Sequence, residues 1–264
     1  MQTKYFDIHA HLNCKDFDVD RDEVIERCKE EGVLVNNVGT SLVTSREVCA
    51  LAESAAADEH LYATVGVHPT DWEQGFDEKE FRALAEHPRV IAIGECGLDY
   101  FHMKDENERV EQKKLFEQHI VLAESVQKPL MLHVRSMLQS PQQAYNDVLE
   151  ILNAYPQVRA HAHFFAGDWS IAQRYLDRDI SLSFTGVITF ARQYDEVIRK
   201  IPRDMLLAET DAPFVAPEPY RGRRGEPLYV REVVEKLAEI RGEAPEELAE
   251  ALLHNALSRF AIGT

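Results

Sequence analysis

The chain has 264 residues, 45% of them hydrophobic, and a formal net charge of −17. This length and composition suffice to bury a full core, and no segment approaches the roughly 20 consecutive apolar residues of a membrane-spanning helix. The acidic balance disfavours a broad basic surface for nucleic acid or anionic lipid, but it leaves room for an enzyme whose positive charge comes from bound metal ions.

Short apolar segments alternate with longer segments of helical periodicity along the chain. The predicted strands are residues 4–10, 33–39, 61–68, 90–95, 129–134, 158–164, 180–186 and 205–211. They are mostly apolar rather than alternating, which is typical of strands covered by protein on both faces. Helical patterns include 20–31, 44–56, 107–126 and 141–155. Asp20 and Thr44 are the expected N-caps of the first two.

Eight strands alternating with helices predict an α/β fold, a parallel TIM (β/α)8 barrel, with an open doubly wound sheet as the alternative. Two further helical stretches, 227–242 and 245–262, follow the eighth strand. We expect the second to be an added C-terminal helix that packs on the barrel. Because the chain has no internal repeat, linker or low-complexity tract, we expect residues 1–264 to form a single domain.

Polar residues stand at the ends of the predicted strands. They are His9, His11, His68, Glu95, His133, His163 and Asp211. The carboxyl ends of all strands of a parallel barrel meet at one rim, where such enzymes build their active sites. One histidine at a strand end is more simply a hydrogen-bonded residue at the core boundary. Four or more imidazoles and two carboxylates on one rim instead favour a site for Zn, Mn, Ni or Co.

The tripeptide HAH occurs twice, at residues 9–11 and 161–163. A strand has a side-chain period of two, so both imidazoles of each copy point to the same face. Strand geometry alone leaves open whether both copies bind metal.

Several segments resemble the successive motifs of the TatD-family metal-dependent hydrolases, a branch of the amidohydrolase-like barrels. They are FDIHAHL, VGVHP, AIGECGLDY, PLMLHVR, HFFAG, SFTGVITF and LLAETDAPFVAPEPYRGRRGEP, followed by a closing HNALSRF. The resemblance implies a TIM barrel with two divalent metal ions, from among Zn, Mg, Mn, Ni and Co. It also implies phosphodiester hydrolysis, typically by a deoxyribonuclease that acts from a DNA end.

The resemblance also implies a ligand set. His9, His11 and Asp211 would hold one ion, and His133 and His163 the second, with Glu95 bridging both. The family motif HCFSG aligns with HFFAG, which selects His163 and leaves His161 as a buried, hydrogen-bonded residue one inward layer deeper.

Three positions depart from the family pattern, namely Ser136, Phe164 and Ala166. None of them is a presumed ligand, so the expected effect is confined to substrate contacts near the fifth and sixth strands.

The catalytic residues are expected to be Glu95 and Asp211, with Asp211 as the general base. The expected substrate contacts are His68, Arg135 and Arg221. Arg135 shares a strand face with His133, and Arg221 lies inside the PEPYRG motif. For His102, Arg223 and Arg224, a substrate contact and a plain loop residue remain alternatives.

The expected substrate is DNA, at single-stranded ends, with no membrane and no obligate protein partner. A second hypothesis is a hydrolase of another ester or amide, such as an aminoacyl-tRNA deacylase or a lactonase, because metal-activated water serves both reactions. A third is an inactive binding module, which the intact ligand set disfavours.

The cysteines are Cys14, Cys28, Cys49 and Cys96, and they form no CxxC pair. The first residues lack the uninterrupted apolar run of a signal peptide. We therefore expect reduced thiols and a cytoplasmic protein.

Overall fold

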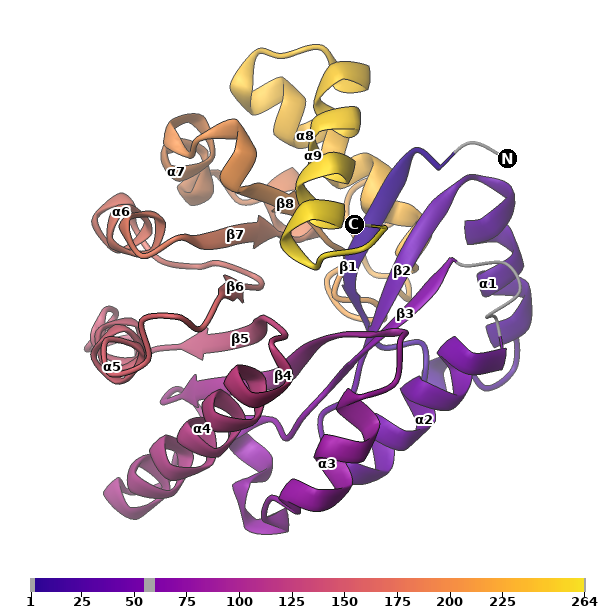
Figure 1. Cartoon of the computed structure of the whole chain (residues 1–264). Coiled ribbons are helices and arrows are strands. Elements are labelled where there is room, and N and C mark those ends of the chain that lie inside the picture. The colour runs from indigo at the N-terminus through magenta and orange to yellow at the C-terminus, as the bar shows by residue number, and fades with distance from the viewer. Residues whose placement is uncertain (1–2, 55–59, 264) are drawn as a thin grey trace.

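Eight parallel strands form a barrel in the computed structural model of the chain, which describes residues 3–54 and 60–263 (Figure 1). The strands are β1 (Tyr5–Ala10), β2 (Val33–Val38), β3 (Leu61–Val65), β4 (Val90–Asp99), β5 (Leu130–Arg135), β6 (Ala160–Ala162), β7 (Ile180–Phe184) and β8 (Leu206–Ala208). They pair in sequence order, and every pair is parallel. The prediction of a TIM barrel is confirmed, because a doubly wound sheet would reverse its strand order.

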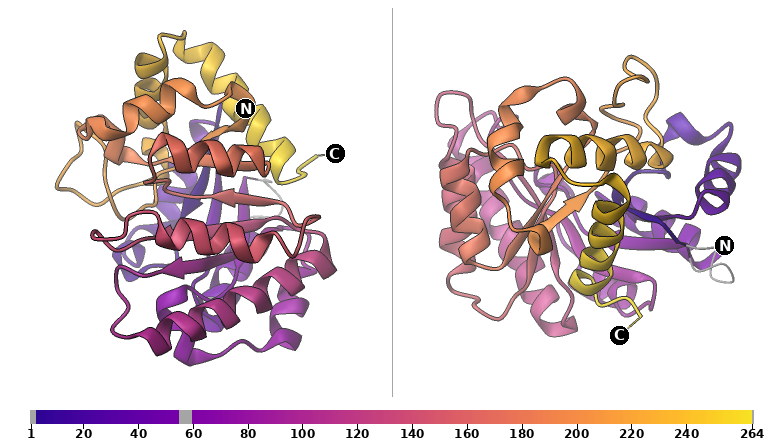
Figure 2. Two further views of the ribbon diagram at one scale, coloured as in Figure 1. Left: turned by 90° about the vertical axis from the view of Figure 1, so that its left-hand side faces the viewer. Right: turned by 90° about the horizontal axis from the view of Figure 1, so that it is seen from above.

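Helices lie outside the strands in all three ribbon views (Figures 1 and 2). They are α1 (Arg21–Glu30), α2 (Leu42–Ser54), α3 (Glu78–Ala85), α4 (Glu106–Val126), α5 (Gln143–Leu152), α6 (Trp169–Asp177), α7 (Asp195–Lys200), α8 (Val230–Arg241) and α9 (Pro245–Arg259). This cover explains why the strands are apolar on both faces. Nothing among the described helices is long and apolar enough to cross a membrane.

Several strands end earlier than predicted. β3, β6 and β8 stop before His68, His163 and Asp211, which lie in the loops that follow. Their backbone N–H groups bond elsewhere: that of His68 donates to the carbonyl of Thr40 (2.9 Å), and that of Asp211 to the carbonyl of His9 (2.9 Å). β4 instead runs past its predicted end at Glu95.

The predicted N-caps have different outcomes. Asp20 precedes α1 as expected, but its side chain makes no capping bond and pairs with Arg224 instead (2.6 Å). Thr44 as the N-cap of α2 is wrong, because the helix begins at Leu42. The hydroxyl of Ser41 accepts from the N–H of Thr44 (3.2 Å) and satisfies one free donor of the first turn. Residues 55 and 56 of the predicted helix lie outside the described residues.

The added C-terminal helix is α9, which contacts β1 and β8 (Figure 1). Just past its end, Phe260 joins an apolar cluster with Phe6, Tyr62, Met131 and Leu207. Those four residues come from strands all around the barrel, so their side chains meet inside it. Phe260 packs edge-on against Phe6, with 6.5 Å between ring centroids. The C-terminal segment thus closes the barrel end opposite the site.

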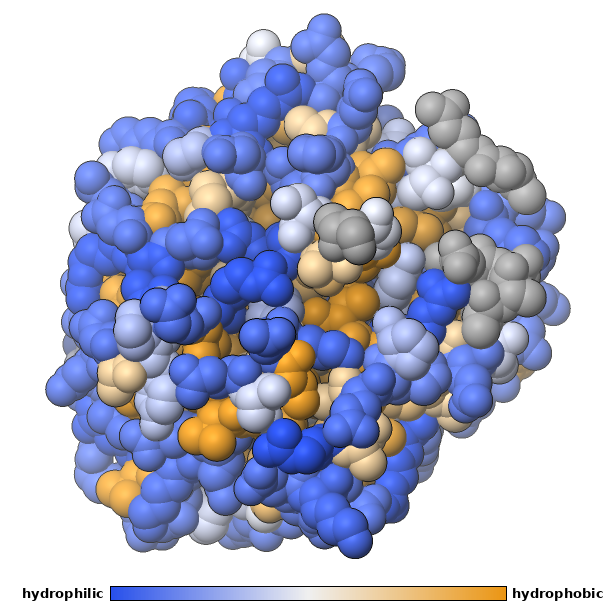
Figure 3. All heavy atoms as spheres, viewed as in Figure 1, coloured by the Kyte–Doolittle hydropathy of each residue, from blue (hydrophilic) through white to orange (hydrophobic). Residues whose placement is uncertain are grey.

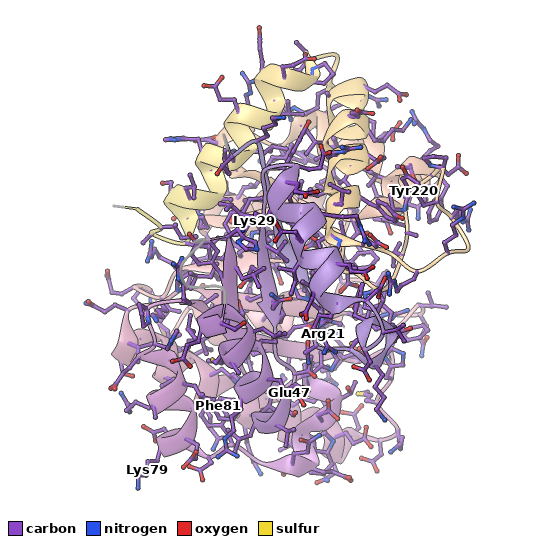
Figure 4. All side chains as sticks on the ribbon, turned by 90° about the vertical axis from the view of Figure 1, so that its right-hand side faces the viewer. Arg21, Lys29, Glu47, Lys79, Phe81 and Tyr220 are labelled. Carbon is purple, nitrogen blue, oxygen red and sulfur yellow. The ribbon has the colours of Figure 1, made fainter. Side chains whose placement is uncertain are left out.

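The outer surface is mainly hydrophilic on the face that α9 crosses, with apolar residues in smaller patches (Figure 3). Figure 4 shows a second face, where Glu47 and Lys79 project from α2 and α3. Phe81 of α3 is fully buried. The outer helices therefore bury apolar residues toward the barrel and turn charge to solvent.

We predict that Phe260→Ala lowers the free energy of unfolding by about 3–5 kcal/mol, because it removes a buried ring and leaves a cavity. Urea unfolding followed by circular dichroism measures the change. Val19→Ala is the control, since Val19 is 95% exposed. Equal stability of the two variants would contradict closure of the barrel by the C-terminal segment.

Candidate metal centre

The junction of β1 and β8, called the seam here, brings the first site residues together. The N–H of Asp211 donates to the carbonyl of His9 (2.9 Å). Just below, the buried carboxylate of Asp7 accepts from the N–H (2.8 Å) and hydroxyl (2.5 Å) of Thr210. These bonds close the barrel between its first and last strands. They place His9, His11 and Asp211 side by side although 200 residues separate them in the chain.

A β-bulge in β1 aims the histidines inward. The register of β1 against β2 shifts between Asp7 and Ala10. Ile8 belongs to the apolar cluster inside the barrel, and the next residue, His9, also faces inward, toward Glu95. An extra residue reverses the alternation of side chains. The bulge therefore lets one strand supply both the apolar floor and the polar layer above it.

The first candidate group, called the seam group, consists of His9, His11 and Asp211. The Nε2 atoms of the two histidines are 3.2 Å apart, and Oδ1 of Asp211 lies 3.7 Å from the first and 3.4 Å from the second. Ligand atoms about 2.1 Å from one ion are about 3.0–3.4 Å apart in octahedral or tetrahedral geometry. Two imidazoles and a carboxylate at these separations fit a divalent ion.

The second candidate group, called the β5–β6 group, consists of His133 and His163. Nδ1 of His133 and Nε2 of His163 are 3.4 Å apart, and each lies 2.8 Å from Oε1 of Glu95. The other oxygen, Oε2, lies 3.4 Å from Nε2 of His9 and 3.9 Å from Nε2 of His11. Each oxygen of this one buried carboxylate thus faces a different group, which is the arrangement a bridging carboxylate requires.

The carboxylates and imidazoles around Glu95 stabilise each other's charge. Burial alone would raise the pKa of Glu95, but the charges of His163 and His9 and the hydrogen bond from His133 hold it well below its ordinary value. Burial alone would lower the pKa of His163, but the carboxylates of Glu95 and Glu209 raise it well above its ordinary value. A divalent cation would take over this neutralising role from the imidazoles.

His68 lies beside the second group, with 4.3 Å between its ring centroid and that of His133. Its Nε2 is 3.7 Å from Oε1 of Glu95, close enough to form a possible metal cluster with Glu95 and His133, besides the one that His9, Glu95 and His163 form. The Nδ1 of His68 lies 2.6 Å from the hydroxyl oxygen of Thr70 and 3.3 Å from the backbone nitrogen of Thr70, and we assign both Thr70 groups as donors, which places the ring proton on Nε2. Burial, followed by the charge of His133, lowers the pKa of His68 to about 3. A neutral ring with a proton on Nε2 is a hydrogen-bond donor toward the cavity.

The two histidines of the second HAH lie in different surroundings. His161 is fully buried, and its two ring nitrogens bond to the hydroxyls of Ser181 (2.8 Å) and Ser183 (2.7 Å). Its ring packs edge-on against Phe260, with 6.0 Å between centroids. His161 is therefore a hydrogen-bonded residue below the candidate metal ligands, and its ring does not reach them.

Two buried carboxylates near the candidate ligands were not predicted from the sequence. Oδ2 of Asp99 lies 3.0 Å from Nε2 of His133, and Oε1 of Glu209 lies 3.6 Å from Nδ1 of His163 while accepting from the N–H of Phe164 (2.5 Å). Carboxylates behind ligand histidines fix the orientation of the ring. The period of two was the available signal, since each stands on the same face as a predicted site residue, four after Glu95 or two before Asp211.

A cavity of about 640 Å³ opens above both groups. Its lining includes three non-glycine residues in the left-handed backbone region: Phe164 (φ 42°), Asp211 (φ 58°) and Val215 (φ 48°). Such conformations cost of order 1–3 kcal/mol each and persist where surrounding structure enforces them, commonly at functional sites.

The predicted substrate contacts are not all in the cavity. His68 and Arg135 line it. Arg221 does not, and its guanidinium stacks over Phe190, 3.7 Å from the ring centroid. A phosphate contact by Arg221 therefore stays a prediction.

The structure also shows the surroundings of His102, Arg223 and Arg224, whose roles the sequence left open. Arg224 is held by Asp20 and Glu226, and His102 bonds to Asp99 (2.8 Å) outside the cavity lining. For both, the contacts favour a structural loop residue. Arg223 is exposed.

Comparison with known proteins adds the following. A family model described as TatD related DNase matches residues 6–261. An uncharacterized metal-dependent hydrolase of Bacillus subtilis, YabD, is 38% identical, over 97% of this chain and 99% of the relative. A protein of Erwinia amylovora named 3′-5′ ssDNA/RNA exonuclease TatD is 33% identical, over 97% and 100%. The crystal structure of YjjV, a TatD homologue from Escherichia coli K12, superposes with a TM-score of 0.87 at 27% identity, over 99% and 100%.

The two histidines of the second HAH should respond differently to substitution. His163→Ala is expected to lower the bound metal per chain, because it deletes a group facing Glu95. His161→Ala should keep the metal content and lose stability, because two buried hydroxyls lose their partner. Elemental analysis after metal loading, together with urea unfolding, measures both. Loss of metal in His161→Ala alone would reverse the assignment.

Glu209→Gln tests the carboxylate behind His163. Glutamine keeps an oxygen for the N–H of Phe164 but removes the charge, so we expect metal affinity to fall about 10–100-fold. Competition with a chromophoric chelator measures it. Glu218→Gln, which neutralises an exposed carboxylate in the loop after β8, is the control. Unchanged affinity in Glu209→Gln would show that this charge does not orient His163.

Proposed function

The chain belongs to the family of TatD-related DNases, and from this premise we propose a divalent-metal-dependent deoxyribonuclease that hydrolyses phosphodiester bonds at single-stranded DNA ends. The relative named 3′-5′ ssDNA/RNA exonuclease supports an end of a single strand as the substrate. We propose that one domain carries the whole activity, since the family match covers residues 6–261.

The observation that carries the proposal is the carboxylate of Glu95, whose two oxygens face two ligand groups. We assign two divalent ions, one to the seam group and one to the β5–β6 group, with Glu95 shared. When bound, such ions supply Lewis acidity and a water of lowered pKa. Zn, Mg, Mn, Ni and Co all accept imidazole or carboxylate ligands, so the donor set leaves the metal open.

Asp211 is assigned as the proton acceptor for the attacking water. Burial alone would raise its pKa, but the hydrogen bond from His11 and the charges of nearby imidazoles hold the pKa below its ordinary value. The carboxylate is therefore ionised at neutral pH and can accept a proton. Asp211 lines the cavity, and the hydrogen bond from its backbone N–H to the carbonyl of His9 holds the residue in place.

His68 and Arg135 are assigned to the phosphate. A neutral His68 donates a hydrogen bond from Nε2 but is a poor proton donor, so phosphate binding is its role in this proposal. Arg135 follows His133 by two residues and lines the same cavity. A guanidinium suits phosphate because its N–H groups form paired hydrogen bonds.

The net charge of −17 is compatible with this substrate. Two divalent ions bring +4, and the four carboxylates beside the ligand histidines, Glu95, Asp211, Asp99 and Glu209, return −4, so the ions neutralise the buried acidic charge of the site. Exposed charges beyond a Debye length of about 8 Å are largely screened at physiological salt. The four free cysteines suit a reducing compartment, and we propose the cytoplasm.

The substrate class can be tested directly with purified protein loaded with Mg²⁺, Mn²⁺ or Zn²⁺. We expect metal-dependent removal of nucleotides from end-labelled single-stranded DNA. Asp211→Asn should lower the rate about 10²–10⁴-fold, because asparagine cannot accept the proton. Gel analysis of the products measures it. Glu218→Gln is the charge control and should keep the wild-type rate.

The same assay includes an aminoacyl-tRNA and generic esters. Turnover of an aminoacyl ester without cleavage of any DNA would move the protein to the ester and amide hydrolases. The ligand groups would then serve that reaction.

A further inference from the structure

Exposed large apolar side chains gather on the rim that carries the metal groups. Among the described residues, those side chains are Val19, Val43, Phe101, Val110, Val121, Leu138 and Phe214. Only Val110 and Val121 lie elsewhere, on α4. The other five stand in or next to the loops after β1, β2, β4, β5 and β8. Two of these five, Phe101 and Phe214, are aromatic, and aromatic rings can bind a planar ligand by stacking.

Phe214 stands beside the seam group. Its side chain is 53% exposed, and its ring meets the ring of His11 edge-on, with 6.1 Å between centroids. The backbone holds it there, because its N–H donates to the carbonyl of Asp211 (2.9 Å). A Cβ on Gly225 would lie only 2.8 Å from the carbonyl oxygen of Phe214, so the loop packs closely behind it. Phe214 therefore exposes part of its ring at the cavity wall, on a backbone that these contacts hold.

Phe101 and Arg135 stand beside the β5–β6 group. Phe101 is 41% exposed, and the guanidinium of Arg135 lies over its ring, 4.2 Å from the centroid. Arg135 lines the cavity and follows His133 by two residues on β5. A guanidinium stacked on an aromatic ring makes a flat, cationic surface. Phe214 thus lines the cavity on the side of the seam group, and Arg135, backed by the ring of Phe101, lines it on the side of the β5–β6 group.

We propose that Phe214 and the Phe101–Arg135 pair are stacking platforms for the two bases that flank the scissile phosphate of an unpaired nucleic acid strand. This inference rests on the proposed function and names what the site recognises. A phosphodiester joins two nucleosides. When the phosphate binds at the seam group and the β5–β6 group, one base lies toward Phe214 and the other toward the Phe101–Arg135 pair. Both platforms need bases with free faces, so the site selects unpaired ends over duplex.

The charge of the protein supports recognition through bases. The chain carries 46 acidic and 29 basic residues, so few cations are available to pair with successive phosphates. Binding through phosphates releases counterions and depends steeply on salt. Stacking on aromatic rings is tolerant of sequence, and because it neutralises no phosphate it releases no condensed counterions. We therefore expect a shallow salt dependence of the affinity.

The test compares two single-stranded 12-nucleotide substrates with the same number of phosphates. One carries all its bases, and the other has abasic tetrahydrofuran residues at the two nucleotides of the cleaved end. Michaelis constants are measured for the wild type, and dissociation constants by fluorescence anisotropy in Asp211→Asn. We expect the abasic strand to bind at least about thirtyfold more weakly, because base–aromatic stacking contributes about 1–3 kcal/mol per base and two bases are missing.

Variants separate stacking from general packing. Phe214→Ala should weaken the strand with bases about five- to a hundredfold and the abasic strand little, whereas Phe214→Trp should keep the wild-type preference. Leu138→Ala is the matched control, because Leu138 is 83% exposed on the same rim, does not line the cavity and cannot stack.

Each outcome decides the proposal. Equal binding and cleavage of both strands by the wild type would overturn the platforms and leave the nuclease standing. Equal losses on both strands in Phe214→Ala would assign that residue to structure and also overturn the proposal. Failure of the wild type to bind or cleave either strand would overturn the proposed function together with the inference.

Discussion

One buried carboxylate, that of Glu95, is the constraint on which the site depends. Its side chain is 5% exposed and faces five imidazoles. A buried charge is costly unless it is paired, so the surrounding rings must approach it closely. The long strand β4 carries it to the cavity floor, and β1, β5 and β6 bring histidines to its two oxygens. Because each of the two oxygens faces a different set of histidines, we propose two metal ions at this site.

The hydrogen bonds of the seam close the barrel and also set the geometry of the site. Because Asp211 bonds through its backbone to His9, the first and last strands cannot separate without dismantling the seam group. The Asp7–Thr210 bonds lie directly below, in the layer that supports the histidines. Stability and metal binding are therefore coupled here, since a ligand that binds only the folded state stabilises it. The loops that follow the strands carry both site residues, such as Asp211, and the exposed aromatic residues of the rim.

Local pattern predicted the elements well where the periodicity was long, and less well at their ends. Eight strands were found because apolar runs and helical runs alternate clearly. The end of β8 was misplaced because Thr210 and Asp211 read as strand but bond across the seam. Thr44 was misread because Ser41, three residues earlier, offers an equally good cap. Asp99 and Glu209 were missed although each stands an even number of residues from a predicted site residue, because only the tertiary contacts show that they lie behind His133 and His163.

The sequence by itself determined the barrel, the rim of polar residues and, through its resemblance to the TatD family, the choice of His163 over His161. These follow from periodicity and motif, which are properties of neighbouring residues. Only the tertiary structure decided which oxygen of Glu95 faces which histidine, that Arg224 is held by Asp20 and that Arg221 lies outside the cavity. Such contacts join residues far apart in the chain, and their geometry depends on register, bulges and loop paths that no local pattern specifies.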